Sequence, residues 1–301
     1  MISRPIALAV VGLAAWSMTA AAADAQTTLR YKFKEGDTLK YVLEQKMKMT
    51  MNVMGNDIEM NMDQSSDMTW SIGKVDDKGN AKITVKFGRQ KMNMKSPMGN
   101  VEVDSNSTQE PDDPLGQILY KVTKALAGVE VSGTVNPQGE YSDIVVPDKA
   151  LKEFQELPGS ANFGDMFSPD GIKRMLSQSG LIMPKEAVSK GKTWKNKTEM
   201  KLPIGKMLAE VEYTYNGPDE KGGRTLEKIA LKPKATLEPD KNAPIAMKLK
   251  SHSATGTAYF DNEAGRLQEV VTQQNMEMEA DVMGMAFTQK MTQTMTMRLA
   301  K

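Results

Sequence analysis

Methionine is the residue type in this sequence whose number and spacing could do chemistry. The chain of 301 residues has 25 methionines, one histidine and no cysteine. Methionines recur at every second position in several stretches, above all between Thr38 and Ile72. Their thioether sulfurs can ligate a soft cation such as Cu(I), and their flexible side chains can adapt to an apolar ligand.

Three interpretations of these methionines stay open. In the first, methionine only fills the inner face of a curved sheet, in a structural or protein-interaction domain. In the second, which is our functional hypothesis, methionine lines a concave face that binds or carries a lipid or an acyl chain. In the third, Met49, Met51, Met60 and Met62 bind Cu(I) through their thioethers. We assign no residue as a metal ligand and expect no cofactor. The candidate ligand-binding residues are Met47, Met49, Met51, Met60, Met62, Met68, Trp70, Met276, Met278, Phe287 and Met291.

The residue patterns that mark common enzymes are missing from the sequence. It has no G-x-S-x-G elbow, no H-E-x-x-H pair and no phosphate-binding loop. His252 stands in an alternating polar context, which is typical of a solvated face of a strand. The adjacent carboxylates of Asp112 and Asp113 point apart and resemble helix-capping residues. We therefore expect a non-catalytic protein with no catalytic residues.

Alternation of apolar and polar residues predicts the strands that position the methionines. Residues 38–53 and 58–72 form a long hairpin with a two-residue loop at Gly55-Asn56, which pairs Met51 with Met60. A second hairpin turns near residues 283–285, and a loop at 283–284 or at 284–285 leaves the same faces inward. Strands of this length must twist, so we expect a curved sheet with its methionine face inside.

The remaining patterns predict a mainly β (α+β) fold. Further strands are expected at 29–33, 81–94 (with a bulge at Gly88), 129–135, 141–146, 207–215, 225–237 and 245–260. Asp113 and Pro114 begin a helix over Leu115–Leu126, and shorter helices are expected near Asp148 and after Ser168. The expected architecture is a long antiparallel, strongly curved sheet or half-barrel. A few helices from a central insert, about 110–183, pack on its concave face.

The N-terminus has the pattern of a secretory signal peptide. Arg4 precedes an apolar run, and Ala23-Asp24-Ala25 is a cleavage motif, so we expect a signal peptide at 1–25 and one domain at 26–301. We expect a soluble protein exported to the periplasm or beyond, because no later apolar run is long enough to span a membrane. A net charge of +1 without basic blocks argues against nucleic acid as a partner. Protein partners and oligomeric state stay open.

Two segments also carry a resemblance to a known family. The run from Leu29 to Tyr41 and the later Gly191-Lys192-Thr193-Trp194 resemble an uncharacterised family of secreted bacterial β-rich proteins, a domain of unknown function. That family has no assigned activity, so the resemblance implies no site residues. In architecture alone, the expected sheet and helices resemble the lipoprotein-carrier half-barrels of the bacterial periplasm, in which a curved sheet holds acyl chains.

Overall fold

The computed structural model describes residues 26–53, 55–97, 99–156, 171, 180–202, 205–240, 246–282 and 285–300. Within these residues the chain forms twelve β-strands and two α-helices, so the fold is mainly β, as predicted. The strands are β1 (Thr38–Val53), β2 (Asn56–Val75), β3 (Ala81–Ser96), β4 (Gly99–Asp104), β5 (Glu130–Val135), β6 (Tyr141–Val145), β7 (Thr193–Leu202), β8 (Gly205–Lys221), β9 (Arg224–Pro239), β10 (Ala246–Asp261), β11 (Arg266–Val282) and β12 (Met285–Leu299). The helices are α1 (Pro114–Leu126) and α2 (Asp148–Gln155).

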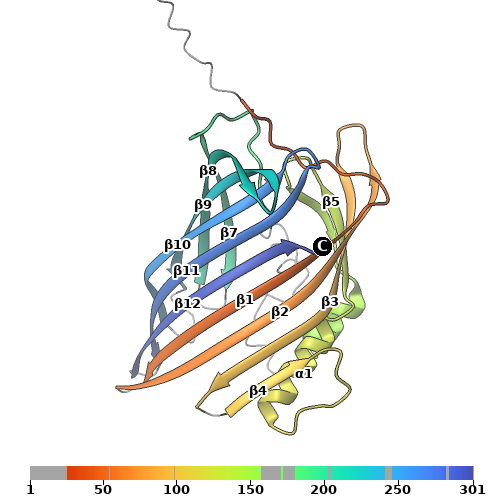
Figure 1. Ribbon diagram of the computed structural model, residues 1–301. Coiled ribbons are helices and arrows are strands. Elements are labelled where there is room, and N and C mark those ends of the chain that lie inside the picture. Colours follow the sequence, from red (N-terminus) through yellow and green to blue (C-terminus); the bar gives the residue numbers. More distant parts are fainter. Residues whose placement is uncertain are drawn as a thin grey trace, which may run out of the picture.

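All these strands belong to one antiparallel sheet. Its order is β6-β5-β3-β2-β1-β12-β11-β10-β9-β8-β7, with β4 paired to β3 beside this path. The first long strand, β1, therefore lies in the middle of the sheet against the last one, β12. Figure 1 shows the sheet curling so that β7 and β8 lie behind β12 and β1. Because β6 and β7 do not pair with each other, the sheet is an open half-barrel.

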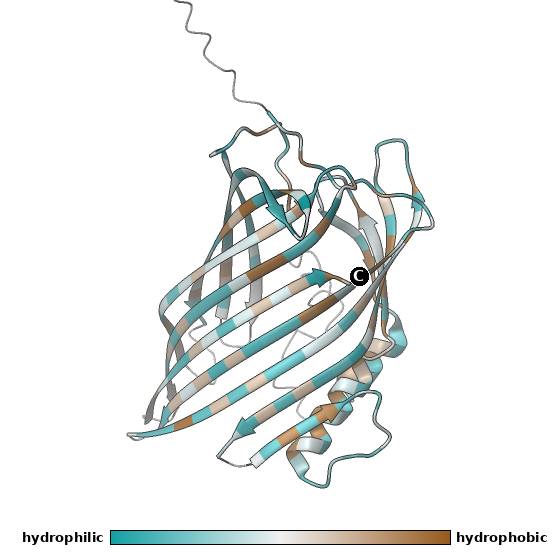
Figure 2. Ribbon diagram, viewed as in Figure 1, coloured by the Kyte–Doolittle hydropathy of each residue, from teal (hydrophilic) through white to brown (hydrophobic). Residues whose placement is uncertain are grey.

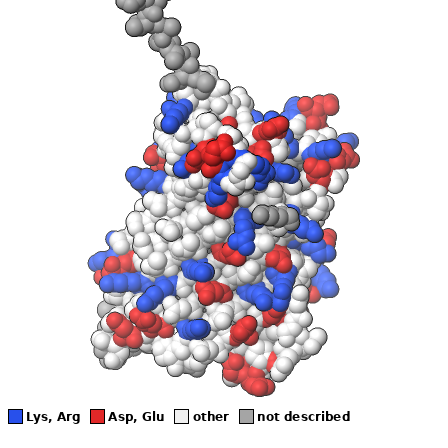
Figure 3. All heavy atoms as spheres, in the orientation of Figure 1, with Lys and Arg blue, Asp and Glu red and all other residues white. Residues whose placement is uncertain are grey.

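The two faces of the sheet differ in polarity because side chains alternate along each strand. Figure 2 shows this alternation as teal and brown bands along β1, β2, β11 and β12. Charged side chains of neighbouring strands pair on the outer face, as Lys48 does with Glu59 at 3.2 Å and Arg298 with Glu44 at 2.6 Å. Figure 3 shows cations and anions interspersed over that surface.

One end of the inner face is closed by two segments outside the strands, and we call it the packed end. Its cluster of buried residues is Leu29, Tyr31, Tyr41, Leu181, Met183, Val188, Tyr213, Tyr215, Ile229, Ala258, Phe260, Leu267 and Met297. The predicted strand at 29–33 is wrong, since this segment is not part of the sheet. It crosses the inside of the sheet instead, where the Tyr31 ring meets Phe260 edge-on at 5.2 Å. Residues 181–188 cross beside it, and Thr27 forms an isolated bridge with Val188.

Helix α1 begins and ends where the sequence predicts. The Asp113 carboxylate accepts a hydrogen bond from the Gly116 N–H at 2.7 Å, and Pro114 takes the first helical position. Leu115, Leu119 and Tyr120 pack on a cluster of Met94, Val101 and Val103 from β3 and β4. These β3 and β4 residues share the inner face with the packed end. The helix therefore covers one margin of that face, as the fold prediction requires.

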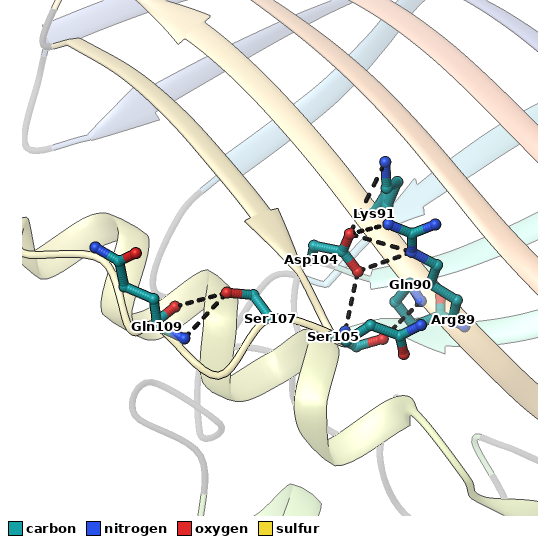
Figure 4. Close-up of polar contacts among 8 residues, drawn as sticks. Arg89, Gln90, Lys91, Asp104, Ser105, Ser107 and Gln109 are labelled. Carbon is teal, nitrogen blue, oxygen red and sulfur yellow. Dashed lines mark hydrogen bonds and ion pairs between the residues drawn. The ribbon is translucent and has the colours of Figure 1, made fainter.

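A polar junction holds β4 and the start of the insert against β3. The predicted bulge at Gly88 is confirmed, because two residues of β3 face one residue of β2 between Phe87 and Gln90. Figure 4 shows Arg89 forming an ion pair with Asp104, with Nε at 3.0 Å from the nearer carboxylate oxygen. The Arg89 hydrogen bond lowers the pKa of Asp104 to about 2. Beside it, Ser105 Oγ accepts the Gln90 N–H at 2.9 Å.

The first hairpin is shifted by two residues from the predicted register. Val53 pairs with Asn56 rather than with Ile58, and Met49 rather than Met51 pairs with Met60. The faces are unchanged, because a shift by an even number of residues keeps each side chain on its side. Gly55 takes a positive φ of 86° in this loop, which a residue with a side chain rarely adopts. In the last hairpin Val282 pairs with Met285, which is the register expected for the first of the two predicted loops.

Two predicted elements lie outside the described residues. These are the signal peptide at 1–25 and the helix that was expected to begin at Ser168. The short helix predicted near Asp148 is confirmed as α2, although Asp148 is its first residue and not its cap. Neither described helix has the length and apolar content that a bilayer span requires.

Candidate ligand-binding face

Strand register brings the predicted methionines of two distant hairpins into contiguous rows. Met60, Met49, Met291 and Met276 are successive partners across β2, β1, β12 and β11. Directly opposite residues in such a ladder have β-carbons about 4.5–5.5 Å apart, which brings neighbouring thioethers within contact. The sheet order alone therefore assembles a continuous methionine row from residues more than two hundred positions apart.

We call the inner side of β1, β2, β11 and β12 away from the packed end the methionine face. It comprises Met47, Met49, Met51, Ile58, Met60, Met62, Met276, Met278, Phe287 and Met291. Met94 of β3 extends it, because Met94 pairs with Met62. Sequence reasoning did not include Met94 in the site, although the phase change at Gly88 already turned it inward.

A band of carboxamides separates the methionine face from the packed end. Gln45 pairs with Gln64, and Gln274 pairs with Gln293 in the adjoining strands. Gln274 Nε2 donates to Gln293 Oε1 at 2.6 Å. Within the methionine face, Gln289 Nε2 donates to the thioether sulfur of Met49 at 2.7 Å. These side chains carry no charge and satisfy part of their hydrogen bonding among themselves.

Burial separates the methionine face from the core, while outward neighbours range from exposed to half-buried, as Thr50 and Glu277 are. Its methionines and Phe287 are half-buried, whereas outward neighbours such as Lys46, Lys48 and Asp63 are exposed. Among the described residues, the inward positions carry no Asp, Glu, Lys or Arg over 39–53 of β1, 58–70 of β2, 270–280 of β11 and 287–299 of β12. Met47, Met49, Met62, Met276 and Met291 belong to none of the clusters of buried residues that the described chain forms.

Two of the predicted site residues lie elsewhere on the inner face. Met68 and Trp70 pack against the buried cluster of the packed end. The Trp70 ring lies 5.2 Å from Tyr41 and 6.4 Å from Tyr141. The structure therefore groups nine of the eleven predicted residues on the methionine face and places these two beside the core.

A seam interrupts the sheet beside the methionine face. Pairing between β9 and β10 stops at Leu231 and Gly256, just before Pro233, which has no N–H to donate to β10. Two residues further on, the Ala235 N–H donates to His252 Nδ1 at 3.2 Å, in place of a backbone carbonyl. A surface cavity of about 390 Å³ opens there, lined by Lys232, Pro233, Lys234, His252, Ser253, Ala254, Thr255, Gln273 and Asn275.

His252 therefore differs from the solvated residue that its sequence context indicates. It is half-buried and lies opposite Met276 at the end of the methionine row. Because Nδ1 accepts a hydrogen bond, Nε2 carries the hydrogen of the neutral ring. The described residues contain no group of three or more His, Cys, Asp or Glu side chains that could hold a metal ion.

A family model matches more than half of the chain. The match covers residues 78–267, from the turn before β3 to the start of β11. The chain belongs to DUF6263, a family of unknown function. This agrees with the resemblance to an uncharacterised β-rich family, and the family assigns no activity to the methionine face. A search of curated proteins found no match.

Solved structures with related folds are only distantly similar. Lipovitellin, in a structure of its lipid–protein interactions, is 12% identical with a TM-score of 0.44, over 90% of this chain and 26% of the lipovitellin chain. A putative exported protein with a YmcC-like fold from Bacteroides fragilis is 7% identical with a TM-score of 0.24, over 91% and 98% of the two chains. An outer membrane channel from Pseudomonas putida is 6% identical with a TM-score of 0.25, over 90% and 97%. This chain thus spans about a quarter of lipovitellin. With TM-scores below 0.5, these similarities carry no argument about its ligand.

Proposed function

We propose that this DUF6263 protein is a non-catalytic, exported binding or carrier protein that holds an apolar ligand, such as a lipid or an acyl chain, on the methionine face. The observation that carries the proposal is the contrast in burial along one inner face. The same alternating strands, β1 and β12, bury Tyr41 and Met297 at the packed end but leave Met49 and Met291 half-buried. A face that is apolar, free of charge and incompletely covered fits an apolar ligand.

The free energy of covering apolar surface on the methionine face is large enough for an apolar ligand to bind. Covering 300 Å² of apolar surface would contribute about 7 kcal/mol at roughly 25 cal/mol per Å². Association costs of at least about 4 kcal/mol reduce this gross figure. The surplus of at most about 3–4 kcal/mol corresponds to a dissociation constant of a few millimolar, so micromolar binding requires a larger covered area. Methionine helps because its unbranched side chain adapts to ligands of different shape.

The test is binding of the neutral fluorescent probe N-phenyl-1-naphthylamine to the mature chain. We compare wild type with the pair Met49→Gln and Met291→Gln, which are direct neighbours on the inner face. The control pair is Thr50→Gln and Lys290→Gln, direct neighbours on the outer face of the same two strands. We expect probe affinity to fall at least about tenfold in the inner pair, equal to about 1.4 kcal/mol, and to stay within twofold in the outer pair.

Competition then defines the ligand class. Oleate and a phospholipid with short acyl chains should displace the probe from wild type. No probe binding at micromolar concentrations, or equal loss in the inner and outer pairs, would contradict the proposal and favour the structural or protein-interaction domain.

A second candidate function rests on the row of four methionines. Met60, Met49, Met291 and Met276 follow one another in direct register, and three thioethers can form a soft site for Cu(I). Anaerobic Cu(I) titration against a competing chelator tests it. The pair Met49→Leu and Met291→Leu should abolish Cu(I) binding if the row holds the ion, while leaving probe affinity nearly intact. Unchanged Cu(I) affinity in this pair would exclude the metal site.

Export and domain organisation form part of the same proposal. We infer a signal peptide at 1–25, cleaved after Ala25, and a single domain at 26–301. The single continuous sheet supports one folding unit. Mass spectrometry of the protein purified from its own host would give the mature N-terminus, expected at Gln26, together with any ligand that stays bound.

A further inference from the structure

Two buried hydrogen-bond donors near the packed end have no partner in the described structure. They are the indole Nε1–H of Trp70 and the Nε–H of Arg266. Neither group can act as an acceptor, so neither can satisfy the other. Buried donors in native proteins are nearly always paired, and an unpaired one points to an acceptor such as a water or an ion.

Trp70 and Arg266, the residues that carry these donors, both line one small cavity of about 30 Å³. It lies where the N-terminal segment and the turn between β10 and β11 meet on the inside of β1 and β2. The lining residues are Tyr31, Lys32, Phe33, Lys34, Asp37, Leu39, Tyr41, Trp70, Ile72, Ala264, Gly265 and Arg266. Its walls are thus mainly aromatic and aliphatic, and its polar groups are mostly donors.

The walls of this cavity are held in place by the fold. The Lys32 N–H donates to the Gly265 carbonyl at 3.0 Å, and a β-carbon on Gly265 would collide with the Lys32 backbone. The Tyr41 hydroxyl donates to the Leu267 carbonyl at 3.1 Å, which fixes the start of β11 above β1. These contacts fix the backbone on both sides of Arg266.

Charge distinguishes Arg266 from the other described arginines. Arg89, Arg224 and Arg298 form ion pairs with Asp104, Asp261 and Glu44, and Arg30 donates to three backbone carbonyls. Arg266 forms no ion pair with a carboxylate of the described chain. Around the cavity, Lys32, Lys34 and Arg266 face a single acid, Asp37. Burial raises the pKa of Tyr41 above its usual range, and the nearby Arg266 charge opposes this rise.

We propose that this cavity binds a monoatomic anion of the size and charge of chloride, held between Trp70 Nε1–H and Arg266 Nε–H. Two buried donors without partners, and three cationic side chains against one acid among the lining residues, select an anion over a cation. The volume selects a single atom, because a space of this size holds about one water-sized particle. Phosphate, sulfate and carboxylate ligands are too large. The anion joins β2 to the start of β11 and so braces the packed end.

The first experiment is crystallography of the mature wild-type protein soaked in sodium bromide. Bromide replaces chloride and scatters anomalously, so we expect an anomalous peak within about 3.5 Å of both nitrogens. A density feature without anomalous signal, or no feature, would show a water or an empty cavity and would overturn the proposal. This test needs no variant and does not depend on ligand binding at the methionine face.

The second experiment measures Tm at constant ionic strength while sodium gluconate is replaced by sodium chloride. Binding to the folded state alone raises Tm with the logarithm of the chloride concentration above the dissociation constant, by about 2–4 °C at ten times that constant. Arg266→Gln should remove this chloride dependence. The control Arg224→Gln, which removes an arginine paired to Asp261 nearby, should keep it. Equal Tm in chloride and gluconate for wild type would overturn the proposal.

Discussion

The packed end and the methionine face are two parts of one inner surface, and β1, β11 and β12 contribute residues to both. At the packed end, residues 29–33 and 181–188 cross the sheet and bring Tyr41, Ile229 and Phe260 to 2% exposure or less. On the methionine face the inward side chains keep partial exposure. The difference teaches that an apolar alternation fixes which way a side chain points but not what covers it. Cover depends on segments that come from elsewhere in the chain.

Truncating one methionine in each region gives the largest expected contrast. Met183 is 2% exposed within the packed end, whereas Met291 is half-buried on the methionine face. Met183→Ala should lower the free energy of unfolding by about 2–5 kcal/mol because it leaves a cavity. Met291→Ala should cost about 1 kcal/mol, since the removed atoms were only partly buried. Urea unfolding measures both, and equal costs would break the comparison.

Alkaline pH should act on the packed end, where the inward tyrosines lie. Burial raises the pKa of Tyr213 to about 12 from its ordinary value of 10.0. Because the folded state holds this proton more tightly, its contribution is complete below pH 10 and is lost as pH rises through 12. A pKa difference of about two between the folded and unfolded states corresponds to about 2–3 kcal/mol of folding stability. We expect urea midpoints to fall between pH 10 and 12, and Tyr213→Phe to flatten that fall. An equally steep fall in Tyr213→Phe would contradict this assignment.

The seam between β9 and β10 should give the smallest effect of the three. His252→Ala removes the acceptor of the Ala235 N–H, which should cost about 1 kcal/mol of folding stability.

The opposite change at the seam is Pro233→Thr, which supplies a backbone donor toward β10. It should lower the rate of hydrogen exchange at neighbouring amides of β10. Exchange that is fast at the packed end and slow beside the seam would reverse the expected order of stability.

Much of the fold follows from local pattern. The faces of β1, β2, β11 and β12 were predicted because a period of two survives an error of two residues in register. The register itself was missed because loops at 54–55 and 55–56 both place Gly55 in the turn. Side chains decide between them: Asn52 Nδ2 donates to Asp57 Oδ1 at 2.6 Å, and Gly55 N–H donates to Asn52 Oδ1 at 3.2 Å.

What the sequence misses depends on contacts between distant segments. Leu29, Tyr31 and Phe33 alternate like a strand, yet this segment lies across the sheet, where tertiary packing overrides the local pattern. The sequence around His252 predicts a solvated side chain. Its partial burial depends on Pro233, whose lack of an N–H has an effect only because β9 and β10 are adjacent in the folded sheet. The cavity at Trp70 and Arg266 likewise joins β2 to β11, which no spacing in the sequence connects.

The most direct test of a ligand-covered methionine face is the oxidation rate of each methionine by hydrogen peroxide, read by peptide mass spectrometry. Without ligand, Met49, Met276 and Met291 should oxidise several times faster than Met183 and Met297, which are buried in the packed end. Saturating N-phenyl-1-naphthylamine should slow the first three together and leave the last two unchanged. Two results would contradict the account. One is an oxidation rate on the methionine face equal to that of Met183 in the absence of ligand, and the other is an oxidation rate there that does not change when the probe is added.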